Sequence, residues 1–146
     1  MKARKYLMMA NKLDAMIKNK MIEKQQWHDI ALGVTVRMDG ERVKSTGRKS
    51  RMADAIEKMI DVEREIDALI DQLIENKRDI ILTIEQLPTA EYNVMHMIYI
   101  RGMDFFESAS EMKKSYSWVK GKHKSGLKHV QEIIDRNEIH TTDTRN

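Results

Sequence analysis

The stretch Asp104–Val130, DFFESASEMKKSYSWVKGKHKSGLKHV, predicts two helices joined by a tight turn. Asp104 followed three residues later by Glu107 is typical of a helix start, because such a pair can satisfy free backbone N–H groups of the first turn. The apolar residues of this first helix recur at helical spacing: Phe106, Ala109 and Met112. We therefore expect a short amphipathic helix that ends where the sequence becomes basic.

The second helix begins after a turn made by Lys113 and Lys114, and Ser115 is a favourable N-cap for it. Its apolar positions recur every three or four residues: Val119, His123, Leu127 and Val130. The stretch contains six lysines, and no acidic residue lies between Lys113 and Val130. A helix-turn-helix whose second helix is rich in lysine is typical of proteins that read DNA.

The face of this second helix opposite its apolar positions supplies most of the candidate DNA-binding residues. Together with the two lysines of the turn, they are Lys113, Lys114, Ser117, Trp118, Lys120, Gly121, Lys124 and Lys128. Lysines neutralise phosphates, whereas Ser117, Trp118 and Lys120 lie near the helix start and could reach base edges in the major groove. His123 falls among the apolar positions, so we expect it to pack in the core. The alternative is a solvated basic helix that packs on the rest of the chain.

The composition favours a mostly helical chain of one domain, or a small domain with an appendage. Of 146 residues, 41% are hydrophobic and 34% charged, with one proline and six glycines, so apolar stripes on helices are the expected way to bury surface. The net charge of +3 hardly selects a partner, but residues 54–85 hold ten acidic and four basic side chains. Cysteine is absent, which excludes disulfides and fits a reducing cytosol, and no window is apolar enough to span a membrane.

The N-terminal half predicts two long helices. Residues 2–26 carry one apolar stripe, and Arg51–Leu87 carries a coiled-coil-like rhythm of apolar residues spaced alternately by four and three. We expect these helices to fold back antiparallel through the basic, glycine-containing stretch Gly33–Ser50, with self-dimerisation through the same seam as the alternative. That stretch reads as a flexible loop, or else as a basic loop that touches nucleic-acid backbone.

Pro88 marks the boundary between this hairpin and the C-terminal unit. A further helix over Thr89–Arg101, closed by Gly102, precedes the opening stretch and would complete a trihelical unit. The expected architecture is all-α: a hairpin over 1–87 for scaffolding or dimerisation, a helix-turn-helix unit over 88–136, and a frayed tail over 137–146.

Catalytic patterns are missing from the sequence. The five histidines form no HExxH pattern, and neither a glycine-rich phosphate loop nor a GxSxG motif is present. The acids of residues 54–85 are spread over a helix surface. We therefore expect no enzyme, no catalytic residue, no metal site and no cofactor.

The block from Leu87 to Leu127 resembles region 4 of sigma-70-type factors. The residues that carry the resemblance are Leu87, Pro88, Glu91, Val94, Met95, Tyr99, Gly102, Ala109, Ser115 and Val119. Over residues 4 to 134 the chain also resembles the ArpU/RinA class of small regulators of Gram-positive phages and prophages, through the loop GERVKSTG at 40–47 and MADAI at 52–56. The resemblance implies a cytoplasmic, nucleoid-associated transcriptional regulator that binds double-stranded promoter DNA, contacts host RNA polymerase and activates late phage genes.

Four positions depart from the family pattern: Ser108, Lys113, Lys122 and Gly126. Ser108 and Lys122 replace apolar residues, Lys113 replaces the turn glycine, and Gly126 replaces a small alanine, so the packing of the unit is thinner than in the family. Two other functions stay open. One is a protein-interaction module that docks on RNA polymerase or a phage protein, and the other is a small packaging protein that binds DNA without regulating transcription.

Overall fold

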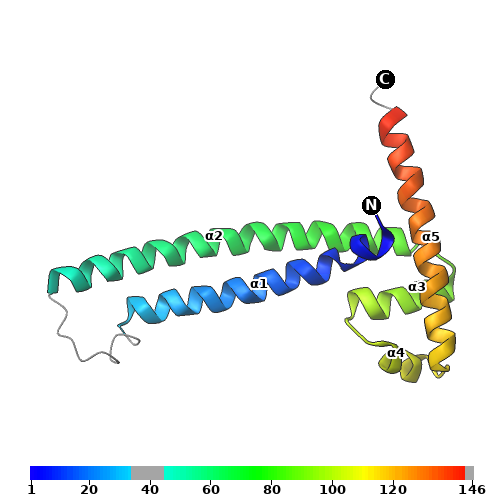
Figure 1. Ribbon diagram of the computed structural model, residues 1–146, viewed down its shortest axis with the longest axis horizontal. Helices are drawn as coiled ribbons and strands as arrows, with labels where there is room; N and C mark the ends of the chain where they lie inside the picture. Colours follow the sequence, from blue (N-terminus) through cyan, green and yellow to red (C-terminus); the bar gives the residue numbers. More distant parts are fainter. Residues whose placement is uncertain (34–44, 144–146) are drawn as a thin grey trace. The chain divides into compact units, whose positions relative to one another are not determined.

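The computed structural model describes residues 1–33 and 45–143, and every regular element in these ranges is a helix (Figure 1). The elements are α1 (Ala3–Ala31), α2 (Ser45–Ile84), α3 (Thr89–Met95), the π-helical segment η2 (His96–Ile100), α4 (Phe105–Met112) and α5 (Tyr116–Asp143). The all-α prediction is therefore confirmed. None of the described helices carries an apolar stretch long enough to cross a membrane.

The two long helices differ in extent from the prediction. Helix α1 continues past residue 26 to Ala31, and α2 begins at Ser45 and ends at Ile84 rather than running from Arg51 to Leu87. Leu87 follows a tight turn in which its N–H donates to the carbonyl of Ile84 at 3.0 Å, immediately before Pro88. Residues 34–44 of the predicted loop lie outside the described residues.

The apolar rhythm predicted for this segment is present in α2. One row of its buried or half-buried side chains follows a spacing of four and three: Ala55, Met59, Val62, Ile66, Leu69, Leu73, Asn76, Ile80 and Thr83. Ala55 is buried in this row, whereas its neighbour Ile56 is exposed. Isoleucine is the more hydrophobic of the two, so hydrophobicity alone does not reveal which position is buried.

The chain divides into two compact units: residues 13–72, and residues 1–12 together with 73–146. In the first unit α1 and α2 run antiparallel, as the crossed order of two ion pairs shows: Lys20 Nζ lies 2.6 Å from Glu65, and Lys24 Nζ lies 2.8 Å from Glu63. These charges are partly exposed, so they contribute little free energy and mainly fix register. Leu13, Ile17, Val62 and Ile66 supply much of the buried apolar surface.

The second unit does not follow the predicted boundary between residues 87 and 88. One hydrophobic core joins residues from the start of α1, the end of α2, the α3–η2 helix and α5: Ala3, Leu7, Ala10, Ile80, Ile84, Leu87, Met95, Tyr99, Val130, Ile133 and Ile134. The hydroxyls of Tyr6 and Thr83 also share a hydrogen bond of 3.0 Å. The first turns of α1 therefore belong to the same core as the C-terminal helices.

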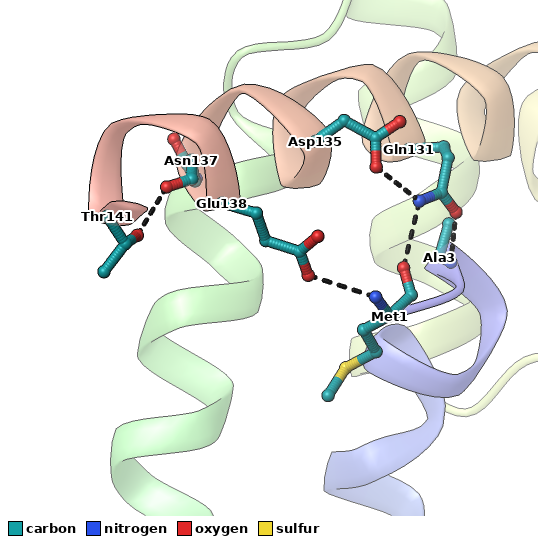
Figure 2. A network of polar contacts seen from close by, with 7 residues as sticks. All are labelled: Met1, Ala3, Gln131, Asp135, Asn137, Glu138 and Thr141. Atoms are coloured by element: carbon teal, nitrogen blue, oxygen red, sulfur yellow. Dashed lines mark hydrogen bonds and ion pairs between the residues drawn. The ribbon is translucent and has the colours of Figure 1, made fainter. Parts of the chain in front are cut away.

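The start of α1 is tied to α5 by a network of polar contacts (Figure 2). Gln131 accepts a hydrogen bond from the backbone N–H of Ala3 at 2.7 Å and donates one to the carbonyl of Met1 at 2.9 Å. The terminal ammonium of Met1 lies 3.0 Å from Glu138. These bonds satisfy backbone groups at a helix start, which otherwise lack intrahelical partners.

Helix α5 continues to Asp143, which corrects the predicted frayed tail over residues 137–143. Two contacts accompany this extension: the pairing of Glu138 with Met1, and a hydrogen bond of 2.6 Å from the Thr141 hydroxyl to the carbonyl of Asn137. No glycine or proline interrupts the chain after Gly126, so the sequence holds no stop signal there. Residues 144–146 lie outside the described residues.

The shared core makes a direct prediction. Leu7 has no exposed surface, whereas its neighbour Met8 is 48% exposed. Truncation of a fully buried leucine leaves a cavity and costs about 2–5 kcal/mol, so we expect Leu7→Ala to lower the free energy of unfolding by that amount. The loss should also unfold α5, measured by urea denaturation followed by Trp118 fluorescence in a Trp27→Phe background, because Trp27 is the other tryptophan of the chain.

Met8→Ala is the matched control, because it removes an exposed side chain from the next position. A change within about 0.5 kcal/mol is expected for this variant. If Leu7→Ala left the Trp118 transition unchanged, the first turns of α1 would not belong to the C-terminal core.

Candidate nucleic-acid interface

Local backbone chemistry sets the bounds of α4. Asp104 has extended backbone angles and its Oδ1 accepts the Glu107 N–H at 2.8 Å, which confirms the predicted cap. Gly102, just before it, has a φ of 70°, as expected of a residue that closes the preceding helix. Asp104 thereby starts α4 directly after the helix formed by α3 and η2.

The turn after α4 depends on Lys113, which adopts the left-handed conformation with φ 55° and ψ 42°. The N–H of Lys113 donates to Ser110 at 3.3 Å, and that of Lys114 donates to Ala109 at 3.1 Å, so two free carbonyls at the helix end are satisfied. Lys113 is the one non-glycine residue with positive φ in the described part of the chain. This is the position where the resemblance implies glycine.

The start of α5 confirms the predicted N-cap. Ser115 Oγ accepts the Trp118 N–H at 3.1 Å, so one of the free amides in the first turn of the helix is paired by a side chain. Three adjacent residues therefore form the turn between α4 and α5. Lys113 adopts the left-handed conformation, the N–H of Lys114 donates to the carbonyl of Ala109, and Ser115 caps α5.

The core beneath this turn differs from the prediction in one residue. Val94, Ala109 and Val119 form a buried cluster, against which Phe105, Ile98 and Trp118 pack. Phe106, which was predicted to face this core, is 71% exposed, because Phe105 lies on the face shared with Ser108 and Ala109. Ser108 is fully buried, and its hydroxyl donates to the Asp104 carbonyl at 2.8 Å, so the polar group at this thinned position is satisfied locally.

A further departure from the family pattern, Gly126, has a reason in the packing. A Cβ atom at this position would lie 3.0 Å from the sulfur of Met95, which has no exposed surface. The missing side chain on α5 is therefore filled by methionine from α3. At Gly121 no atom would come within 4 Å of an added Cβ, so that glycine faces open space.

His123 lies in the core, as predicted. Its ring is 5% exposed, its Nε2 lies 2.7 Å from the Tyr99 hydroxyl, and Phe105 meets it edge-on with ring centroids 5.1 Å apart. Burial and the positive charge of Arg4 both lower the pKa of His123. Burial also raises the pKa of Tyr99, and the charge of Arg4 partly offsets that rise. His123 is therefore favoured in its neutral form.

A second polar pair crosses from α3 to α5 and was not predicted. The Glu91 carboxylate is 5% exposed, and His129 Nδ1 lies 2.6 Å from it. A buried carboxylate is costly unless it is hydrogen-bonded, so this pair fixes α5 against α3. The pairing could not be read from the sequence, because the two residues are separated by 38 positions.

The predicted interface residues lie on the surface, with one exception. Lys113, Lys114, Ser117, Lys120, Gly121, Lys124 and Lys128 are exposed. Trp118 is half-buried against the Val94 cluster, and its ring lies between two lysines, with Lys114 Nζ at 5.5 Å and Lys122 Nζ at 5.7 Å from the centroid. The indole therefore holds lysines by cation–π attraction in addition to facing solvent.

An open pocket of about 430 Å³ lies along the exposed face of α5. Its polar rim comes from Arg4 of α1 and from Ser117, Lys120 and Lys124 of α5, while Phe105, His123 and Leu127 line its apolar part. No acidic side chain lines it. Arg4 is the pocket residue that sequence reasoning missed, because a single arginine in the first turn of α1 belongs to no sequence pattern.

Neither a metal cluster nor a known relative adds to this picture. Across residues 1–33 and 45–143, no three His, Asp or Glu side chains gather closely enough to hold a metal ion. Comparisons with models of protein families, with curated proteins and with solved structures found no match to this chain. The basic face of α5 and the pocket beside it are the features that bear on function.

The left-handed turn residue yields a stability prediction. A residue with a Cβ atom is destabilised by about 1–2 kcal/mol in the left-handed region, and glycine avoids this cost. Part of the stability gained is lost again, because glycine has more conformational freedom in the unfolded chain. We expect Lys113→Gly to raise the free energy of unfolding by about 0.5–1 kcal/mol, measured by urea denaturation.

Lys114→Gly removes the same charge one position later, where φ is not positive. That variant should gain nothing and lose up to about 1 kcal/mol. Equal effects of the two substitutions would show that the backbone conformation of Lys113 is not the cause.

The buried His123 predicts how stability varies with pH. Its folded pKa lies below the ordinary value of 6.5, so above that value the ring is neutral in both states. As the pH falls through 6.5, the unfolded chain takes up the proton first, and the free energy of unfolding decreases until the folded pKa is reached. His123→Gln keeps a partner for Tyr99 but does not titrate, so its stability should fall less steeply over this range.

Urea denaturation at a series of pH values measures this difference. His123→Phe, which also lacks the titrating ring, should show the same shallow dependence on a lower overall stability. If the free energy of unfolding of both variants changed with pH as steeply as that of the natural protein, the buried, neutral state of His123 would be contradicted.

Proposed function

We propose that this protein is a sequence-specific, DNA-binding transcriptional regulator that reads duplex DNA with α5. The observation that carries the proposal is the exposed face of α5, where lysines and Ser117 surround a pocket without acidic residues. A surface of this kind attracts phosphates strongly and repels no part of the DNA backbone.

The geometry of α4, the turn and α5 fits a helix-turn-helix, with α5 as the recognition helix. Ser117, Trp118 and Lys120 lie in the first turns of α5, from which such helices reach base edges. Gly121 adds no side chain to this face, so the DNA can approach the helix closely there. Lys113, Lys114, Lys124 and Lys128 would neutralise phosphates on either side.

The rest of the chain fits a supporting role. We interpret α1 and α2 as a hairpin scaffold and the helices from α3 to α5 as a trihelical unit. Exposed apolar residues on the hairpin support a homodimer through it: Met21, Ile22, Ile56, Ile60 and Ile70. The resemblance to sigma region 4 and to phage regulators supports activation of late phage genes, in contact with host RNA polymerase.

One observation favours a protein-interaction module as the second candidate. Phe106 and Tyr116 are exposed beside the turn, and their ring centroids are 4.6 Å apart. Paired aromatic side chains on a surface are typical anchors for protein partners. In that reading α4 docks on RNA polymerase or a phage protein, and DNA contact is secondary.

The test is a charge reversal on the recognition helix. Lys120→Glu combined with Lys124→Glu places two acids where the DNA backbone would lie, so we expect binding to be lost while helicity by circular dichroism is kept. The probe is a duplex selected by the natural protein from a random-sequence library, and binding is measured by fluorescence anisotropy over a range of salt concentrations.

Lys58→Glu combined with Arg64→Glu is the matched control, since both side chains are exposed on α2 and the change in net charge is identical. Binding should survive this control. Duplex affinity that persisted in the α5 variant would reject the DNA-reader function, and a promoter reporter separates regulation from packaging of DNA.

A further inference from the structure

We propose that the pocket between the first turn of α1 and α5 binds a phosphate group through Arg4, Lys120 and Lys124. In a DNA complex, this group would be a backbone phosphate beside the recognition helix, and that part of the inference rests on the proposed function. The first turn of α1 thereby becomes an additional contact outside the helix-turn-helix.

The backbone that carries Arg4 is held in place by its neighbours. Ala3 and Leu7 are both buried in the core, so the helix face next to Arg4 is anchored there. Gln131 of α5 holds the Ala3 N–H and the Met1 carbonyl at 2.7 and 2.9 Å, as Figure 2 shows. Arg4 and the lysines of α5 are therefore carried by elements that are tied together, which pre-organises the site.

The charges of the pocket lack a counterion. None of Arg4, Lys120 and Lys124 forms an ion pair with a carboxylate in the described ranges, and no acidic residue lines the pocket. Three cations that converge without an anion repel one another, and a phosphate between them relieves that repulsion. Arginine contributes a planar fork that matches phosphate oxygens, and the two lysines add point charges beside it.

The floor of the pocket strengthens this attraction. Phe105 and Leu127 are apolar, and His123 is buried with its ring stacked on Tyr99. Charges interact more strongly beside such a low-dielectric wall than in open solvent. His123 also supplies a reporter, because Arg4 already lowers the pKa of its ring and a bound phosphate would oppose that effect.

The consequence for DNA reading is a division of roles. Contacts to phosphates fix where a protein sits on the duplex but carry no sequence information. The inference therefore gives Arg4, Lys120 and Lys124 a positioning role that is equal on all sequences, which moves Lys120 from the residues that could reach base edges to the phosphate contacts. Ser117 and Trp118, toward the start of α5, remain for the bases.

The experiment compares Arg4→Gln with Lys5→Gln in the full chain. Lys5 is an exposed cation at the next position of α1 and does not line the pocket. With Arg4→Gln, we expect affinity for selected and for random duplexes to fall alike by about tenfold. The slope of log affinity against log salt should shrink by about 0.9, the value of one lost phosphate contact.

A second arm uses inorganic phosphate alone, followed through the NMR signals of the His123 ring. Phosphate should change these signals saturably and raise the pKa of His123. Both effects should vanish in Arg4→Gln and persist in Lys5→Gln, which supports the pocket even if no duplex binds. Phosphate binding without duplex binding would reject the proposed function and assign the pocket to a free phosphate-bearing ligand.

The DNA arm supports the inference by itself if Arg4→Gln weakens binding and Lys5→Gln does not. The inference is overturned if the two variants behave alike in both arms. Melting temperatures of both variants check that neither substitution unfolds the chain.

Discussion

The burial of the first turns of α1 in one core with α5 is the constraint on which the C-terminal unit depends. Leu7 and Ala10 share a cluster with Val130 and Ile133, and Gln131 pairs the backbone at the start of α1. Without these residues, α3 to α5 would expose an apolar face and lose the cover of their core. The same contact brings Arg4 to the edge of the basic pocket, so packing and charge arise from one arrangement.

Three buried polar residues of the C-terminal helices each have a hydrogen-bond partner. Ser108 donates to the carbonyl of Asp104 within α4, His123 pairs with the Tyr99 hydroxyl, and Glu91 pairs with His129. The last two pairs join α5 to the helix formed by α3 and η2 with a fixed geometry, which apolar contacts alone do not impose. At Gly126, where α5 has no side chain, Met95 fills the space.

Sequence reasoning succeeded where the cause is local. The caps at Asp104 and Ser115, the closing Gly102 and the buried His123 follow from residue types at fixed short spacing, and the structure confirms them. It failed where the outcome depends on a distant partner. Phe105 and Phe106 are equally apolar, and only the position of α5 decides which one is buried.

The same reason explains the other differences. Ala55 is buried and Ile56 is exposed, although isoleucine is the more hydrophobic of the two. The helical continuation to Asp143 accompanies contacts with Met1, at the other end of the chain. Arg4 joins the candidate interface through those long-range contacts, and a search for patterns within one segment cannot find it.

We propose that the exposed face of α5 meets duplex DNA, and amide chemical-shift mapping by NMR, as a selected duplex is added to the full chain, tests this contact most directly. Perturbations should be concentrated at Lys113–Lys128 and at Arg4, with little change in the α2 segment of residues 45–72. Perturbations confined to other surfaces, or none at saturating duplex, would contradict it.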